Sequence, residues 1–308
     1  MRLITRSDFD GLACAVLLKQ VVPIESIEFV HPKDVQDGKI NVTANDILTN
    51  LPFVTGAGLW FDHHSSEATR TDMDGAHYNG RFEVAPSAAR VVYNHYVEQG
   101  HRNNLRFYED LLESVDKSDS AQLSHEDVTT PSGWILLSYV MDPRTGLAYY
   151  HSYRISNREL MMKMVDWIPQ HDVDEILRMP DVKERVDRYF EGQEVFRKVM
   201  EQHSRVDGNV IVTDLRGIGE MPTGNRFLIY TMYPEANIQV RVFDGKKGEF
   251  VVAALGHSIF NRTSRTDVGQ LMSRHNGGGH RGAGTCQLPL EGAEQKIHDI
   301  IEQCKHDG

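Results

Sequence analysis

Short apolar runs alternate with longer helical patterns along the first hundred residues. They predict strands at residues 3–5, 27–30, 47–50 and 58–61, and helices at residues 11–20 and from 86 to about 100. Pro86 fits the first turn of the second helix, where its missing N–H costs nothing. Short buried strands that alternate with helices are typical of a parallel sheet covered by helices.

The pattern changes twice further along the chain. From residue 100 to about 203 it is helical throughout, and the last helix, at 182–203, is long and charged. Apolar and polar positions then alternate at 209–215, 238–243 and 250–255, followed by a helix at 267–275, a strand near 285–288 and a final helix from 291. The sequence therefore predicts an α/β fold of two domains. Residues 1–190 form a parallel-sheet domain with a helical extension, 191–206 a helical linker, and 207–308 a smaller α/β domain.

Composition restricts the class of protein. Of the 308 residues, 40% are hydrophobic and 25% charged, which is typical of a folded globular chain. The three cysteines, Cys14, Cys286 and Cys304, have no C-x-x-C spacing and fit a reducing compartment. No apolar run approaches the roughly 20 residues that span a bilayer, and the first residues lack a signal-peptide core. We expect a cytoplasmic protein that does not insert into membranes.

Charge is distributed unevenly. The net charge is −11, yet residues 207–308 hold 11 Lys and Arg against 12 Asp and Glu, so the excess acid lies in the first 206 residues. Within residues 256–282, four arginines and three histidines face a single acid, Asp267. Non-specific attraction to nucleic acid is not expected of so acidic a chain, and any polyanion must be bound locally.

Acidic and histidine side chains follow two of the predicted strands. Asp8 and Asp10 come after the first strand, and Asp62, His63 and His64 come at the end of the fourth. The carboxyl ends of parallel strands are where open α/β sheets bind ligands. Carboxylates suit hard divalent cations, and imidazole suits transition metals. Alone, Asp10 would serve equally as a helix cap and the histidines as loop residues, but together these side chains favour a metal site.

Two further segments carry candidate chemistry. Asp116 and Asp119 end a helix, where they are either solvated acids or late members of the same cluster. Near the C-terminus a run of glycines is framed by histidine and arginine, and backbone N–H groups of glycines approach phosphate closely. Upstream of it, a segment supplies hydroxyl, amide and guanidinium groups suited to phosphate oxygens or, alternatively, to a polar surface loop. The candidate phosphate-binding residues are His257, Asn261, Arg262, Gly277, Gly278, Gly279, His280 and Arg281.

These motifs, in this order, resemble the DHH phosphoesterase superfamily with its DHH-associated, GGGH-containing C-terminal domain. The resemblance rests on Asp8-Phe-Asp10-Gly11, Asp62-His63-His64, the Asp116/Asp119 pair and Gly277-Gly-Gly-His280, and it covers essentially the whole chain. Exopolyphosphatase-related and oligoribonuclease-like members are the most similar. The resemblance implies a manganese centre of one or two ions in the first domain, with Mg²⁺ as the alternative ion, and a second domain that binds phosphate.

Roles carried over from the family are specific to each position. The resemblance assigns Asp8 to the first ion, and Asp10, His63 and one of Asp116 and Asp119 to the second. It implies that Asp62 orients His63, that His64 faces the phosphate, and that the second domain holds the far end of the substrate through Gly277–His280, Arg281 and Arg262.

Two positions depart from the family's pattern. Arg6 stands where the family has a histidine, and a guanidinium cannot bind a cation. Asn50 stands where the family has an aspartate that bridges two ions, and Asp46 could replace it only if the strand register were shifted. The first metal site is thereby weakened, or Arg6 itself holds a phosphate in place of the lost metal charge.

Two functions of different classes follow. The first is a metal-dependent phosphoesterase that hydrolyses a short phosphodiester or phosphoanhydride: an oligonucleotide, a cyclic dinucleotide or polyphosphate. Its partner would be a phosphate-rich small substrate or a short single-stranded oligonucleotide, and a homodimer would be ordinary for such a family. The alternative is a non-catalytic nucleotide- or oligonucleotide-binding protein with a degenerate metal site, and a structural role for the helical region is the third hypothesis.

Overall fold

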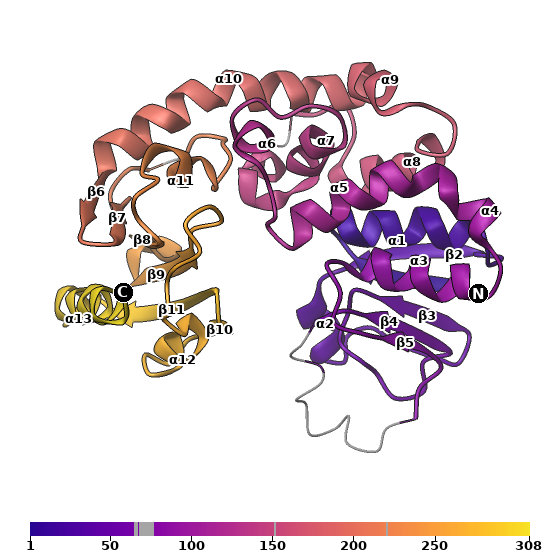
Figure 1. The fold of residues 1–308 in the computed structure, drawn as a ribbon, viewed down its shortest axis with the longest axis horizontal. Coiled ribbons are helices and arrows are strands. Elements are labelled where there is room, and N and C mark those ends of the chain that lie inside the picture. Colours follow the sequence, from indigo (N-terminus) through magenta and orange to yellow (C-terminus); the bar gives the residue numbers. More distant parts are fainter. Residues whose placement is uncertain (65–66, 68–76, 151, 220) are drawn as a thin grey trace. The chain divides into compact units, whose positions relative to one another are not determined.

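The computed structural model describes residues 1–64, 67, 77–150, 152–219 and 221–308. The chain forms two compact units, Met1–Asp187 and Arg188–Gly308 (Figure 1). Within the described residues, no helix is both long and apolar enough to cross a bilayer.

Unit 1 is built on a five-stranded parallel sheet. The strand order is β2-β1-β3-β4-β5, with β1 (Arg2–Arg6), β2 (Ser26–Val30), β3 (Asp46–Thr49), β4 (Leu59–Asp62) and β5 (Gly80–Phe82). The predicted parallel sheet is confirmed, and β5 is an additional edge strand that the sequence did not predict. Because β1, β3 and β4 are neighbours and parallel, their carboxyl ends meet at one edge of the sheet.

Helices cover both faces of this sheet (Figure 1). Helix α1 (Phe9–Lys19) is buried from Phe9 to Leu18, which explains its continuous apolar pattern, and it packs against α3 (Ala88–Glu98) and α5 (Glu109–Asp119). On the opposite face, α2 (Pro32–Gln36) contributes Val35 to a core with Leu48 and Trp60. The site residues that follow β1 and β4 are therefore supported by packed helices and strands.

The predicted helical extension is confirmed. It consists of α4 (Arg102–Leu105), α6 (His125–Thr129), α7 (Gly133–Met141), α8 (Asn157–Trp167), α9 (Val173–Arg178) and α10 (Pro180–His203), with 3-10 turns at Arg106–Tyr108, Pro143–Thr145 and Leu147–Tyr149. The first part of α10 is fixed to unit 1 by Arg185, which is 1% exposed and donates to the carbonyl oxygen of Ile155 at 2.8 Å. Helix α10 begins in unit 1 and ends in unit 2.

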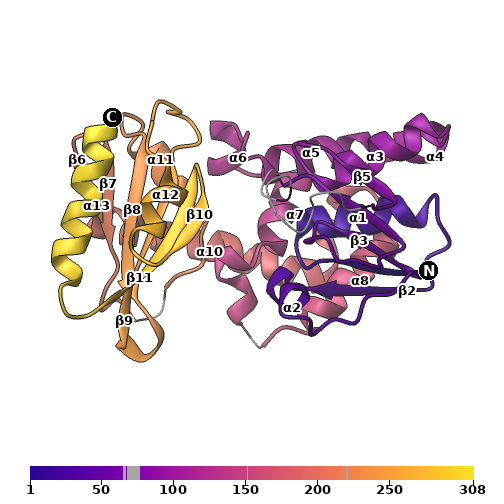
Figure 2. The same ribbon diagram turned by 90° about the horizontal axis from the view of Figure 1, so that it is seen from below.

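Unit 2 contains a mixed six-stranded sheet in the order β10-β11-β9-β8-β7-β6. Its strands are β6 (Ser204–Asp207), β7 (Val210–Asp214), β8 (Ile238–Asp244), β9 (Phe250–His257), β10 (Gly278–His280) and β11 (Ala283–Pro289). Among these strands, β7 and β8 pair in parallel and the other neighbours pair antiparallel. Helices α12 (Val268–Ser273) and α13 (Ala293–Asp307) bury one face of the sheet, while α11 (Leu228–Met232) precedes β8 (Figure 2). The expectation of a smaller α/β domain at the C-terminal side is confirmed.

Candidate metal centre

Asp10 is placed by the first turn of α1 and is 2% exposed. Its two carboxylate oxygens accept the backbone N–H groups of Ala88 at 2.9 Å and Ala89 at 2.8 Å, at the start of α3. A helix N-terminus favours a negative charge. Burial nevertheless raises the pKa of Asp10 well above its usual range, and the carboxylates of Asp119 and Asp8 raise it further. An ionised Asp10 therefore needs a cation close by.

His63 follows β4 and is 8% exposed. Its Nδ1 donates to the carbonyl oxygen of Ala85 at 3.0 Å, so the neutral ring presents an unprotonated Nε2 on its other side. That nitrogen has no hydrogen-bond partner in the described structure and lies 3.2 Å from Asp119 Oδ2 and 3.8 Å from Asp10 Oδ2. One ligand atom from each of the three residues lies within 4.8 Å of the others. A lone pair that faces two carboxylates fits a bound divalent cation.

The structure separates the roles of Asp116 and Asp119. Asp116 Oδ1 accepts a hydrogen bond from Ser87 Oγ at 2.6 Å, and Asp116 Oδ2 pairs with Arg90, whose Nε lies 2.8 Å away. These contacts of Asp116 link α5 to the start of α3. Asp119, at the end of α5, joins Asp10 and His63, and desolvation raises its pKa.

Asp62 holds His64 rather than His63. Asp62 Oδ1 lies 3.0 Å from His64 Nδ1, and Asp62 Oδ2 accepts the backbone N–H of His64 at 3.2 Å. The carbonyl oxygen of Ala85 takes the orienting role toward His63 that the resemblance implied for Asp62. The implied contact is therefore wrong, because both oxygens of Asp62 are directed to His64 and the Nδ1 of His63 is already bound to the backbone.

Asp8, two residues after β1, is not one of the three grouped ligands, although its charge acts on Asp10 and Asp119. Asp8 Oδ1 caps α1 by accepting the backbone N–H of Gly11 at 2.9 Å and also accepts Asn50 Nδ2 at 3.1 Å. Asp8 Oδ2 forms an ion pair with Arg6, whose Nε lies 2.8 Å away. Asp46 does not replace Asn50, since Asp46 stands at the opposite end of β3 and pairs with Arg2.

Arg144 is a cation near this group that the sequence did not single out. It lies in the 3-10 turn after α7, and its Nε donates to Asp142 Oδ1 at 2.8 Å. Desolvation opposes its charge, yet the carboxylates of Asp142, Asp8 and Asp119 raise its pKa. No motif surrounds Arg144 in the sequence, so its position near the site could not be predicted and is known from the fold alone.

In unit 2, three of the predicted phosphate contacts hold the loop itself. His257 Nε2 donates to the carbonyl oxygen of Thr266 at 2.9 Å, and burial lowers the pKa of His257. Asn261 Nδ2 donates to the carbonyl oxygen of Glu235 at 3.0 Å, and Arg262 Nε donates to that of Ile259 at 2.9 Å. These bonds already explain why the segment needs an imidazole, an amide and a guanidinium.

The glycine run forms the edge strand β10, which the sequence did not predict. A Cβ atom at Gly277 would overlap the carbonyl oxygen of Thr285, and one at Gly279 would overlap that of Ala283, whereas Gly278 faces open space. Close pairing with β11 thus accounts for two of the three glycines. The strand ends at His280, and both His280 and the following Arg281 are exposed.

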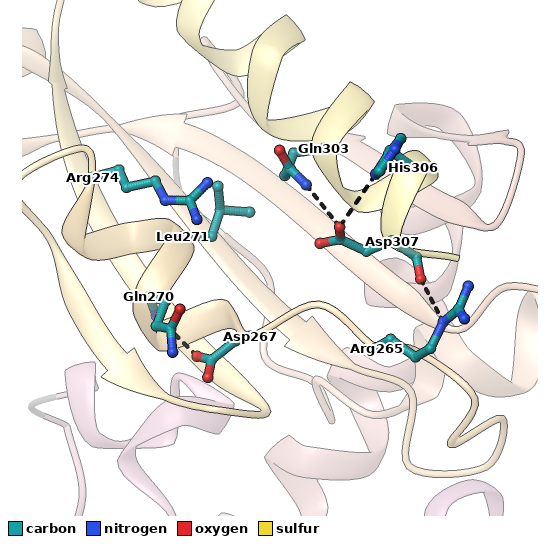
Figure 3. A pocket seen from close by; sticks show the side chains of 8 residues that line it. All are labelled: Arg265, Asp267, Gln270, Leu271, Arg274, Gln303, His306 and Asp307. Carbon is teal, nitrogen blue, oxygen red and sulfur yellow. Dashed lines mark hydrogen bonds and ion pairs between the residues drawn. The ribbon is translucent and has the colours of Figure 1, made fainter.

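Two of the four arginines in the cationic segment line a separate pocket. Arg265 and Arg274 border a hollow of about 450 Å³ with residues of α12 and α13 (Figure 3). Arg265 Nε donates to the carbonyl oxygen of Asp307 at 2.9 Å, and the carboxylates of Asp267 and Asp307 share the pocket wall. Positive and negative side chains are mixed here, so the segment does not present all its arginines to one anion.

Comparisons with known proteins agree with this arrangement. The chain is 45% identical to a pGpG-specific phosphodiesterase, PggH, from Vibrio cholerae, over 100% of this chain and 99% of that one, with a TM-score of 0.87. The fold is also similar to the DHH domain of a protein described as a member of a family of ribosomal proteins, at 13% identity, TM-score 0.55 and coverage of 99% and 86%. RecJ from Thermus thermophilus, solved with Mn²⁺, matches at 12% identity and TM-score 0.50, with this chain spanning 52% of its length and 99% of this chain covered.

A scan against protein-family models gives no match, and a search of curated proteins gives none either. The likeness to the phosphodiesterase nevertheless covers both units at high identity. The chain belongs to the DHH phosphoesterase superfamily, and it is a hydrolase of phosphodiester bonds.

Proposed function

We propose that this hydrolase cleaves the internal phosphodiester of a short linear dinucleotide, with pGpG as the first candidate. The observation that carries the proposal is the 45% identity, over the whole chain, to a phosphodiesterase specific for that dinucleotide. Hydrolysis of pGpG consumes one water, breaks the bond between phosphorus and the 3′ oxygen, and releases two molecules of GMP. The net charge of −11 fits a small substrate better than a long nucleic acid.

A divalent ion, Mn²⁺ or Mg²⁺, would be held by Asp10, His63 and Asp119. This donor set fits such an ion because two carboxylates converge on a buried imidazole nitrogen that has no hydrogen-bond partner within the described residues. When bound, the ion would supply Lewis-acid stabilisation of phosphate charge and a more acidic water.

The remaining residues of the centre would bind the phosphate and move a proton. Desolvation opposes protonation of His64, but its hydrogen bond to Asp62 and the charge of Asp119 raise its pKa above the usual value. With Nδ1 held by Asp62, His64 Nε2 is left to donate a proton to the leaving 3′ oxygen. Arg6 and Arg144 would supply positive charge for the phosphate oxygens, and His280 and Arg281 remain the predicted phosphate contacts of unit 2.

The test is release of GMP from pGpG by the metal-stripped full chain after Mn²⁺ is restored. Cyclic di-GMP, longer oligonucleotides and polyphosphate serve as competing substrates. We expect turnover of the dinucleotide that stops when Asp119 is replaced by Asn and that survives Asp116→Asn. Binding of pGpG without cleavage, unchanged by chelator, would favour the alternative hypothesis of a non-catalytic nucleotide-binding protein.

A further inference from the structure

Both oxygens of Asp8 are already used by this chain's own donors. Oδ1 accepts two N–H groups, from Gly11 and from the side chain of Asn50, while Oδ2 pairs with Arg6 at 2.8 Å. A carboxylate that ligates a cation must instead turn a free lone pair toward it. Within the described part of the chain, the one group of three or more such side chains close enough to share an ion is Asp10, His63 and Asp119, and Asp8 is not in it.

Asn50 completes this arrangement from the end of β3. The residue is 1% exposed and adopts a positive φ of 55°, which asparagine tolerates better than most side chains. Its amide donates to Asp8, so it stabilises the charged carboxylate without adding negative charge of its own. An aspartate here would place a second carboxylate beside Asp8 and create a demand for another cation.

In this chain, Arg6 supplies the positive charge beside Asp8 without a metal. Its guanidinium lies against Asp8, with Nε 2.8 Å from Asp8 Oδ2. A divalent ion on Asp8 would have to lie close to this fixed positive charge, which repels it. Since arginine stays protonated at every working pH, the positive charge is permanent.

We propose that the centre binds a single metal ion, on Asp10, His63 and Asp119, and that the Arg6 guanidinium takes the place of a second ion beside Asp8. This rests on the proposed function, because Arg6 is assigned to the phosphate of the same dinucleotide. Arg6 would hold that phosphate with planar N–H donors, a geometry well suited to two phosphate oxygens.

The experiment counts ions independently of activity. Metal-stripped full-length protein is dialysed against Mn²⁺, and bound manganese is measured by elemental analysis and by calorimetry. We expect one ion per chain in the wild type. The double variant Arg6→His with Asn50→Asp supplies an imidazole and a carboxylate in place of the cation and the amide, and it should bind two.

A matched control is Arg2→His, at the other end of β1, where the arginine also pairs with an aspartate, Asp46. This variant should still bind one ion. Two ions in the wild type would overturn the proposal, as would one ion in a double variant whose circular dichroism shows it to be folded. The wild-type count decides the matter even if the double variant does not fold.

The outcomes also separate this proposal from the substrate assignment. A wild-type chain that binds one ion but leaves pGpG intact refutes the substrate and supports the single-ion centre. A chain that cleaves pGpG with two bound ions refutes the single-ion centre and supports the substrate.

Discussion

Binding of Mn²⁺ should stabilise the folded chain, and Asp119 should be required for that effect. Asp119→Asn keeps the size of the side chain and removes one of the three side chains that could bind a metal ion. Asp116→Asn, one helical turn earlier, serves as the matched control because its carboxylate is engaged by Ser87 and Arg90 instead. The two variants therefore differ in the expected response to metal although both remove one negative charge from the end of α5.

The size of the effect follows from linkage. An ion at 100 times its dissociation constant stabilises the state that binds it by about 2.7 kcal/mol. For a unit of 187 residues, 1 kcal/mol corresponds to roughly 2–4 °C in Tm, so Mn²⁺ should raise the transition of unit 1 by about 5–11 °C. Asp116→Asn should lower the starting stability by about 1–3 kcal/mol, through loss of its bond to the charged Arg90, and keep the full metal shift.

Differential scanning calorimetry with and without Mn²⁺ measures both quantities and resolves separate transitions if the two units unfold independently. Asp119→Asn should show a metal shift below about 2 °C. A wild-type shift in Asp119→Asn, or loss of the shift in Asp116→Asn, would show that Asp119 is not the carboxylate that binds the ion.

Three further predictions concern side chains around the site and in the core. Arg144→Ala should lower kcat/KM for pGpG about 10-fold, equivalent to about 1.4 kcal/mol, whereas the similarly exposed Arg154→Ala should not; equal rates would exclude Arg144 from the site. Hydrogen bonds from Arg2 lower the pKa of Asp46, which is 2% exposed, so its contribution is present above the ordinary aspartate pKa of about 4 and is lost as the pH falls below it. Asp46→Asn should cost about 2 kcal/mol in urea unfolding at pH 7 and less at pH 3, and a constant difference would contradict this. Burial raises the pKa of Cys304 to about 12, so a thiol reagent should leave it unmodified at pH 8 until denaturant is added; rapid labelling of the native chain would contradict this.

Much of unit 1 could be predicted because its signals are local. The runs that become β1, β3 and β4 are apolar and short, and each is followed at once by polar residues, so the edge that carries Asp8 and Asp62 follows from the sequence. The three residues of β5 give too short a pattern to detect. Strand β10 escaped prediction for another reason, since glycine has little preference for strands and β10 exists through its pairing with β11.

The choice between neighbouring acids could not be predicted. Asp116 and Asp119 are three residues apart and share one side of α5, so helical periodicity treats them alike. Ser87 and Arg90, almost 30 residues earlier in the chain, bind the carboxylate of Asp116. Asp119 is left beside His63. The hydrogen-bond partner of His63 could not be predicted either. It is the backbone carbonyl oxygen of Ala85, and every residue type carries such a group.

One short segment fixes two of the three ligands. The carbonyl oxygen of Ala85 holds the ring of His63, and the N–H groups of Ala88 and Ala89 hold Asp10. Pro86 favours extended backbone at Ala85 and so helps to set this segment. Both side chains thus lose their conformational entropy when the chain folds, and an arriving ion has only Asp119 left to order. Residues that never touch the metal therefore determine how tightly it binds, and an insertion between 85 and 89 would disable the centre with every ligand still present.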